Sequence, residues 1–171
     1  MRLGNDFYLR DVLEVAPALI GTWLCRKLDG QTLRGRITEV EAYRGETDTA
    51  CHARAGRTKR TEVLYMAGGH AYVYLCYGIH NLLNVVTGEE GDPQAVLIRG
   101  LEGLTGPGRL TKAFSITLAE NRLDLVNSAE LWLEDDGYRP GVQTSPRIGI
   151  GYATQEDQAR LWRFTSAGSS S

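Results

Sequence analysis

The chain has 171 residues, of which 42% are hydrophobic and 23% are charged, and its formal net charge is −2. This length and apolar content fit one globular domain, and the slightly acidic balance argues against a protein that coats nucleic acid by bulk electrostatics. No segment approaches the roughly 20 apolar residues that span a bilayer, and the three cysteines form no Cys-x-x-Cys pair, so neither a disulfide framework nor a zinc site is supported. We expect a soluble, cytoplasmic protein.

The first part of the chain predicts a helix followed by an antiparallel pair of strands. Apolar residues recur at helical spacing over residues 11–20, although Pro17 removes one backbone hydrogen bond and can kink the helix or delay its start. Residues 22–28 and 31–43 then read as strands. They flank Asp29-Gly30, a pair that suits the positive φ angles of a tight hairpin turn.

The second of these strands combines carboxylates with an aromatic ring. Because successive side chains of a strand alternate between its faces, Glu39, Glu41 and Tyr43 share one face. That arrangement would place a water-activating base beside a flat stacking surface. A strand whose polar face is simply wet shows the same pattern, so spacing alone leaves both interpretations open.

A basic segment follows His52 and leads into a predicted short helix over residues 60–66. Such a local cluster of positive charge can hold a few phosphates, although an ordinary solvated loop has the same composition. The cations of residues 54–60 are Arg54, Arg57, Lys59 and Arg60.

Residues 71–76 and 81–86 predict a second hairpin, which begins after the chain break at Gly68-Gly69. This pairing leaves Tyr77 at or near the turn. A tyrosine at the tip of a turn exposes apolar area to water unless something stacks on it. The position of Tyr77 therefore points to a contact outside the chain.

The rest of the chain predicts short elements without βαβ alternation. Residues 95–101 read as an apolar strand interrupted by Arg99, and residues 131–133 and 148–150 as further short strands. Residues 106–114 read as a loop that leads into a helix, whose amino end could meet a phosphate together with Arg109 and Lys112. We expect a single domain over residues 1–166 and a flexible polar tail over residues 167–171.

Eight segments, in order and at similar spacing, resemble the alkyladenine (3-methyladenine) DNA glycosylases, and the resemblance covers nearly the whole chain. The segments are GRITEVEAY (35–43), DTACH (48–52), GRT (56–58), YVYLCYG (72–78), NVV (84–86), VLIR (96–99), GP (106–107) and RIGIG (147–151).

The resemblance implies an α+β fold: a single domain with a curved antiparallel β-sheet, a protruding β-hairpin and a few short helices. It implies a monofunctional enzyme of base excision repair that flips alkylated or deaminated purines out of duplex DNA and hydrolyses the N-glycosidic bond, leaving an abasic site. The implied lesions are 3-methyladenine, 7-methylguanine, hypoxanthine and ethenoadenine. No metal or organic cofactor is expected. Double-stranded DNA with a damaged purine is the expected partner of a monomer without an obligate protein partner, on the nucleoid of a prokaryote.

Several positions match residues to which the resemblance assigns a role. Glu41 matches the general base, and Arg99 the arginine that helps to hold the attacking water. Tyr77 matches the side chain that enters the gap left in the duplex, with Ile79 beside it as a second apolar wedge. The expected base pocket consists of Tyr43, His52, Tyr74, Asn84 and Leu97, and the expected contacts to the DNA backbone are Arg54, Arg57, Lys59, Arg60, Arg109 and Arg147.

Within the pocket, the resemblance implies that Tyr43, His52 and Tyr74 sandwich the extruded base and that Asn84 crowds the 2-amino group of normal guanine.

The sequence also departs from the family. Ile79 stands where methionine is frequent, Leu161 stands where proline is usual, and Pro17 falls inside the first helix. These departures bear on stability and substrate range rather than on the reaction type.

The residue types in these segments also favour hydrolysis of an N-glycosidic bond, independently of the resemblance. Breaking an N-glycosidic bond develops positive charge on the sugar, so a carboxylate near the anomeric carbon stabilises that charge and deprotonates the incoming water. The chain has only Lys27, Lys59 and Lys112, none in the pocket-forming segments, which argues against an amine nucleophile that cuts the strand.

Alternative interpretations stay open for individual residues and for the whole chain. Arg99 could be a structural ion-pair partner of Glu39 or Glu102, His52 could cap a loop, and Tyr72 reads as core. The protein could also be a non-catalytic damaged-base-binding protein, for which Glu41 would be dispensable. A third alternative is a nucleoside or nucleotide hydrolase on free substrate, which would need neither Tyr77 nor the basic loop of residues 54–60.

Overall fold

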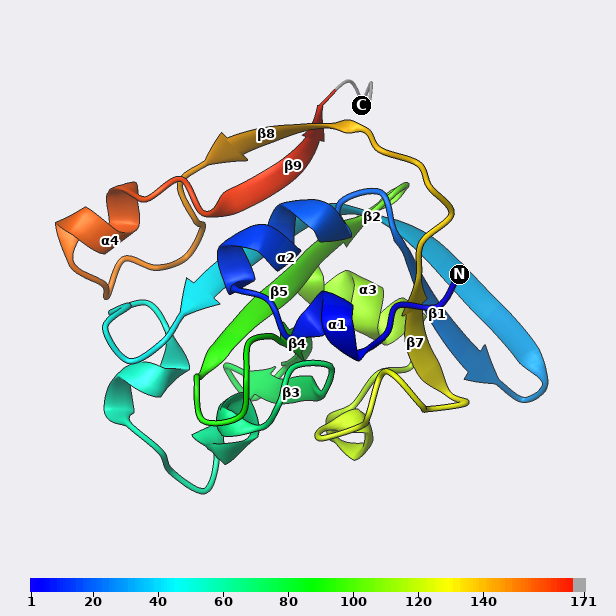
Figure 1. Cartoon of the computed structure of the whole chain (residues 1–171), viewed down its shortest axis with the longest axis horizontal. Helices are drawn as coiled ribbons and strands as arrows, with labels where there is room; N and C mark the ends of the chain where they lie inside the picture. The colour runs from blue at the N-terminus through cyan, green and yellow to red at the C-terminus, as the bar shows by residue number, and fades with distance from the viewer. Residues whose placement is uncertain (168–171) are drawn as a thin grey trace.

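Within the described residues, 1–167, the computed structural model pairs nine strands into one curled antiparallel sheet (Figure 1). The main path through the sheet runs β3-β4-β5-β2-β1-β7, with β6 beside β5, β9 beside β2, and β8 beside β9. The strands are β1 (Trp23–Leu28), β2 (Gln31–Arg44), β3 (Ala71–Cys76), β4 (His80–Val86), β5 (Gln94–Leu101), β6 (Leu104–Thr105), β7 (Leu131–Glu134), β8 (Gly141–Ser145) and β9 (Arg163–Ala167).

The helices are short and lie around this sheet, which agrees with the expected α+β class. None of those in the described residues is long and apolar enough to span a membrane. The α-helices are α1 (Asn5–Tyr8), α2 (Val12–Leu19), α3 (Pro107–Ala113) and α4 (Gln155–Ala159), and the 3₁₀ helices are η1 (His52–Ala55), η2 (Thr61–Tyr65) and η3 (Leu118–Glu120).

The long strand β2 connects both halves of the sheet. Its first residues pair with β1, whereas its later residues pair with β5 on one side and with β9 on the other. Its register against β5 shifts between Ile37 and Val40, and such an irregularity bends a strand and increases its twist. The bend lets one strand contribute Ile37 and Val40 to the core and Tyr43 to the groove described below.

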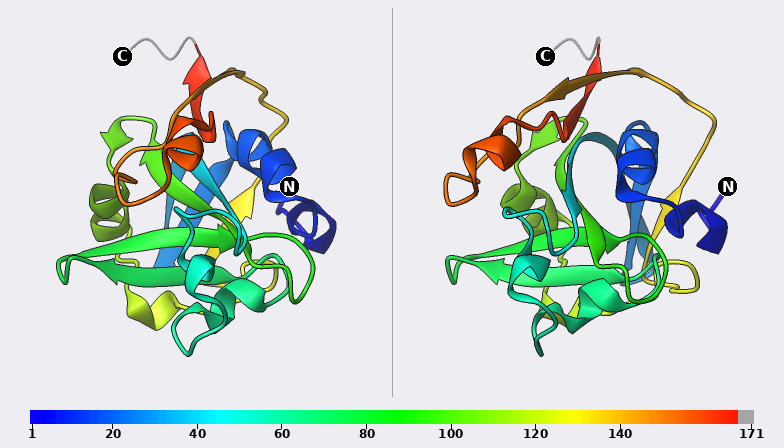
Figure 2. Two further views of the ribbon diagram at one scale, coloured as in Figure 1. Left: turned by 90° about the vertical axis from the view of Figure 1, so that its left-hand side faces the viewer. Right: turned by 60° about the vertical axis from the view of Figure 1, so that its left-hand side comes forward.

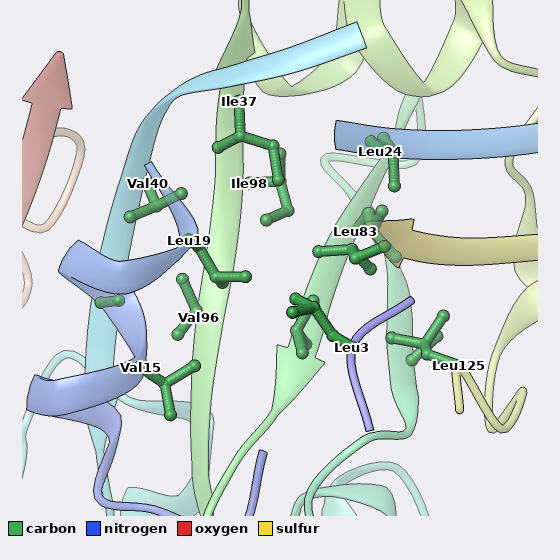
Figure 3. Packing of buried hydrophobic residues seen from close by; sticks show 14 of the residues in the cluster. Leu3, Val15, Leu19, Leu24, Ile37, Val40, Leu83, Val96, Ile98 and Leu125 are labelled. Atoms are coloured by element: carbon green, nitrogen blue, oxygen red, sulfur yellow. The ribbon is translucent and has the colours of Figure 1, made fainter. Parts of the chain in front are cut away.

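Helix α2 covers one face of the sheet and closes the main core. The Asp11 side chain caps it by accepting a hydrogen bond from the Leu13 amide at 2.8 Å. Its apolar face places Val15 and Leu19 against β-strand residues that include Val96 (Figure 3). The helix begins at Val12 despite Pro17, because burial of this face outweighs one missing backbone hydrogen bond.

Both predicted hairpins are confirmed. The β1–β2 turn contains Asp29 with φ of 49° and Gly30 with φ of 79°. In the β3–β4 turn, Tyr77 and Gly78 have φ of 52° and 67°, and the Ile79 amide donates to the Cys76 carbonyl at 3.1 Å. Two consecutive positive φ angles match the right-handed twist of the flanking strands. Figure 2 shows this hairpin extending beyond the rest of the molecule.

The structure corrects three sequence predictions. Residues 148–150 form no strand, because this stretch bends and turns its first amide into the protein. The short helix predicted over residues 60–66 is the 3₁₀ helix η2. Ala167, placed in the predicted tail, is the last residue of β9, and the remainder of that tail, residues 168–171, lies outside the described residues. Strands β8 and β9 have no counterpart among the elements predicted from the sequence.

Candidate active site

A groove of about 690 Å³ opens between the β3–β4 hairpin, the start of α3 and the loop that follows β8. A smaller cavity of about 40 Å³ shares four lining residues with this groove. The shared residues are Tyr43, His52, Tyr74 and Tyr152. A concave site rich in aromatic side chains with a few polar groups is typical of a binding site for a flat organic ligand.

Glu41 is fully buried beneath the groove, with 0% of its surface exposed. Its Oε1 accepts a hydrogen bond from the Tyr43 hydroxyl at 2.7 Å, and its Oε2 accepts one from the Ile148 amide at 2.6 Å. The Arg99 guanidinium lies 3.7 Å from Oε1. Burial raises the pKa of Glu41 above its ordinary value, and these three groups oppose that rise without cancelling it.

The contacts of Arg99 fit both interpretations of this residue, as an ion-pair partner of a nearby glutamate and as a residue that faces the ligand. Its Nε donates to Glu39 Oε2 at 3.1 Å, and the same oxygen accepts from Arg163 Nε at 2.8 Å. Glu39 is therefore the ion-pair partner of Arg99, and it leaves another guanidinium nitrogen pointing at Glu41. Arg99 also lines the groove, so its remaining donors face the space where a ligand would lie.

His52 and Tyr74 lie together as one wall, with ring centroids 4.5 Å apart and planes at 64°. The His52 Nδ1 is 3.0 Å from the hydroxyl of Tyr72, which is buried as expected of a core residue. Burial, with a smaller contribution from the nearby charge of Arg60, lowers the pKa of His52 to about 4. His52 is therefore a neutral ring at pH 7. Tyr43 lines the same two hollows from β2.

Asn84 and Leu97 are buried neighbours on the adjoining strands β4 and β5, where they face each other in the register. The Asn84 amide nitrogen donates to the Tyr72 carbonyl at 3.2 Å, which fixes its orientation. Asn84 lines the smaller cavity and Leu97 lines the groove. Both predicted pocket residues thus lie beside the aromatic walls.

Tyr77 and Ile79 project from the hairpin tip, with 91% and 73% of their surfaces exposed. Tyr77 lines the mouth of the groove. Neither side chain packs into the core, although both are large and apolar. Clustered apolar exposure of this kind is typical of a contact surface.

The predicted basic cluster is exposed beside the groove. The Arg60 guanidinium lies 5.4 Å from the centre of the Tyr74 ring and lines the groove, and that of Arg57 lies 5.4 Å from the Tyr65 ring. Arg109, on α3, lines the same groove. The exposed cations of this loop are Arg54, Arg57, Lys59 and Arg60.

The prediction that Arg147 contacts the DNA backbone is wrong. Its side chain is 0% exposed and forms an ion pair with Asp48, whose side chain is 1% exposed. Two guanidinium nitrogens donate to the two Asp48 oxygens at 2.7 and 3.0 Å. A phosphate on a bound duplex would have no surface of Arg147 to touch.

Two residues of the site were missed in the sequence. Ile148 contributes only its backbone amide to Glu41, and every residue type except proline carries such a donor, so no side-chain signal marks this position. Tyr152 lines both hollows, and its hydroxyl donates to the Ala50 carbonyl at 2.7 Å. An aromatic residue directly after the glycine-rich segment 149–151 is the sequence signal that could have indicated it.

The chemistry available in the site is that of a carboxylate, an arginine and aromatic rings. No lysine is among the described residues that line the groove or the cavity. In residues 1–167, no three His, Cys, Asp or Glu side chains gather closely enough to hold a metal ion.

The chain is similar to known proteins along nearly its whole length. A family model described as methylpurine-DNA glycosylase (MPG) matches residues 6–105 and 102–170. A relative from Borreliella afzelii is 43% identical over 175 residues, covering 95% of this chain and 94% of the relative. One from Methanocella arvoryzae is 44% identical over 182 residues, covering 95% and 90%. Both carry the name "Putative 3-methyladenine DNA glycosylase".

Proposed function

Because the chain belongs to the methylpurine-DNA glycosylase family, we propose that this DNA glycosylase removes alkylated or deaminated purines from duplex DNA as a monofunctional hydrolase. The proposed substrates are 3-methyladenine, 7-methylguanine, hypoxanthine and ethenoadenine, and the proposed product is an abasic site. The observation that carries the proposal is the buried Glu41 carboxylate beside an aromatic groove, with Arg99 next to it.

Glu41 acts as the general base in the proposed reaction. The water oxygen forms a bond to C1′ of the sugar, Glu41 takes a proton from that water, and the electron pair of the N-glycosidic bond leaves with the purine. The carboxylate also stabilises the positive charge that develops on the sugar. The hydrogen bonds from Tyr43 and Ile148 hold the carboxylate in place, and each oxygen keeps a further lone pair for the water.

Arg99 holds the attacking water in this proposal. Its Nε is fixed by Glu39, so its other nitrogens are oriented before the substrate arrives. Preorganised donors cost no rearrangement during the reaction. Its positive charge beside Glu41 also favours the ionised form of the base.

The hairpin tip supplies the side chains that replace the extruded purine. A base inside a duplex cannot reach Glu41, and extruding it costs a few kcal/mol, least where damage has weakened its pairing. Tyr77 fills the vacated space, with Ile79 beside it. Their large exposed apolar surface in the free protein supports this role, since a base stack would cover it.

The aromatic walls select the lesion by its electronic properties, and Asn84 selects it by shape. An alkylated purine that carries positive charge stacks favourably on the electron-rich faces of Tyr43 and Tyr74. Neutral His52 adds a stacking ring without repelling such a cation. Asn84 crowds the position that the 2-amino group of normal guanine would occupy.

The exposed cations hold the sugar-phosphate backbone along the groove. These proposed contacts are Arg54, Arg57, Lys59 and Arg60 in the loop and Arg109 on α3. The protein needs only one such groove to act, so we propose that it works as a monomer in the cytoplasm of a prokaryote, on the nucleoid DNA.

Labelled duplexes with one hypoxanthine or one ethenoadenine, and bulk methylated DNA, test this proposal in the presence of a chelator. We expect release of the damaged base, with strand scission only after alkali. Scission without alkali would contradict the monofunctional reaction. If no base were released while lesion duplexes still bound through Tyr77, the protein would be a damaged-base-binding protein instead.

A further inference from the structure

The buried Arg147–Asp48 pair lies directly behind the site. Arg147 also donates to the Ala42 carbonyl at 3.0 Å and to the Asp157 carbonyl at 3.2 Å. Asp48 additionally accepts from the amides of Arg44 at 3.0 Å and Ala50 at 3.1 Å. The pair thus ties the loop after β8 to the end of β2 and to α4.

The loop held by this pair delivers one of the two hydrogen bonds to Glu41. Ile148 directly follows Arg147, and its amide donates to Glu41 Oε2 at 2.6 Å. Because Arg147 bonds the carbonyl of Ala42, the residue after Glu41, the loop and the strand are fixed at the point where that amide meets the carboxylate. Any shift of Arg147 moves the donor away from the acceptor.

Arg147 also supports the second hydrogen-bond donor. Its guanidinium carbon lies 4.9 Å from the centre of the Tyr43 ring and 5.0 Å from that of Trp162. The guanidinium is therefore stacked between two aromatic rings. The ring of Tyr43, whose hydroxyl donates to Glu41 Oε1, rests on this guanidinium.

We propose that Arg147, anchored by Asp48, is a positioning residue that orients both hydrogen-bond donors of Glu41. This inference rests on the proposed function, because it assigns a role in the same reaction. Arg147 touches neither the DNA nor the reacting atoms and acts only through Tyr43 and Ile148.

The charges around Glu41 set the direction of the expected pH effect. Arg99 of β5 faces the carboxylate directly, Glu39 and Arg163 pair beside it, and the hydroxyls of Tyr43 and Tyr152 lie nearby. The charge of Arg147 and the hydrogen bond from Ile148 both lower the pKa of Glu41. Without them that pKa rises, so the carboxylate becomes protonated at a higher pH.

The test variant carries Arg147→Met together with Asp48→Asn, because removing both partners avoids an uncompensated buried charge. Single-turnover base release from a hypoxanthine duplex is measured against pH. We expect the plateau rate to fall about 10²-fold, as for a small misplacement of a catalytic group. We expect the acidic limb of the profile to move to higher pH and binding of a duplex with an uncleavable abasic analogue to stay unchanged.

Arg139→Met with Asp135→Asn removes an exposed pair of the same type and serves as the control, with rates and profile unchanged. A folded test variant whose acidic limb does not move would overturn the proposal. If the double variant does not fold, Arg147→Lys is measured instead. It keeps the charge but not the hydrogen bonds made by two guanidinium nitrogens, so an unchanged plateau rate in this variant would overturn the proposal. An inactive wild-type protein would instead count against the proposed function.

Discussion

At the scale of single residues, the ionisation of Glu41 reflects opposing effects. Burial favours the protonated carboxyl group, whereas Arg99 and the donors from Ile148 and Tyr43 favour the carboxylate. Burial has the larger effect, so the pKa of Glu41 is raised. A general base with a raised pKa binds its proton more readily than an exposed glutamate does.

The pH dependence of base release tests this balance. Because the base must be ionised, the rate falls as the pH drops through the raised pKa of Glu41, so the acidic limb lies above the ordinary value of 4.5. Arg99→Gln removes the largest opposing effect and moves the limb to still higher pH. Single-turnover rates measured against pH check both expectations, and a limb at or below 4.5 would contradict them.

His52 gives a second, independent pH effect, on stability. Its pKa is about 4 in the folded protein and 6.5 in its ordinary state, so the unfolded chain binds more protons between these values. The stability due to neutral His52 is complete above pH 6.5 and is lost as the pH falls towards 4. Urea unfolding across this range should show a steeper loss for the wild type than for His52→Gln. Equal slopes would show that His52 is not held neutral.

The sequence predicted the shared face of Glu41 and Tyr43 correctly, because strand alternation depends on local order. The sequence placed Arg99 beside Glu41 only through the resemblance, since the two residues lie on different strands. It misplaced Arg147, since the burial of a charged side chain depends on a partner elsewhere in the chain. That partner, Asp48, lies 99 positions away in the sequence. A distant ion pair of this kind leaves no periodic signal.

At the scale of elements, the β3–β4 hairpin combines a strained turn with an exposed tyrosine. Tyr77 has a positive φ of 52°, a conformation that costs a non-glycine residue about 1 kcal/mol or more. A glycine would adopt this turn more easily. The turn therefore keeps a tyrosine at a position where stability alone favours glycine.

Tyr77→Gly separates stability from function in this hairpin. We expect the free energy of unfolding to stay within about 1 kcal/mol of the wild type, since relief of strain offsets the added chain entropy. Base release should fall at least about tenfold, because extrusion costs a few kcal/mol and each 1.4 kcal/mol is a factor of ten. Chemical denaturation and base-release assays measure the two effects. Tyr77→Phe keeps the ring and should remain active, and an active glycine variant would rule out the wedge.

The elements that the sequence predicted well have strong local signals. The two hairpins carry turn residues between alternating strands, and α2 has a helical apolar stripe with Asp11 as its cap. Strands β8 and β9 were missed because they pair at the rim of the sheet and bury little apolar surface. The segment 148–150 was misread because its apolar residues serve a bent loop rather than a strand.

At the scale of the whole molecule, a net charge of −2 coexists with a basic surface beside the groove. The cations Arg54 and Lys59 are exposed in the η1–η2 region, and Arg109 lines the groove from α3. The acidic remainder of the surface disfavours other orientations of the protein on DNA. The charge distribution, rather than the total charge, thus supports DNA binding.

The salt dependence of lesion-duplex binding tests this distribution. Each phosphate that the protein neutralises contributes about −0.9 to the slope of log K against log salt concentration. Replacing Arg54 and Lys59 with glutamine should flatten the slope by about that amount for each phosphate that is no longer neutralised. Arg139→Gln alters an exposed arginine of the Arg139–Asp135 surface pair and should leave the slope unchanged. An unaltered slope in the first variant would show that this loop does not contact the phosphates of the DNA.

The central claim is that Glu41 is the base of a purine-releasing reaction, and single-turnover release of hypoxanthine from duplex DNA by Glu41→Gln tests it most directly. General base assistance is typically worth about 10²- to 10⁴-fold, so we expect a loss of that size while the variant still binds the lesion duplex. Glu130→Gln, at an exposed glutamate just before β7, is the matched control and should retain full activity. A Glu41→Gln protein that releases the base at the wild-type rate would contradict the account.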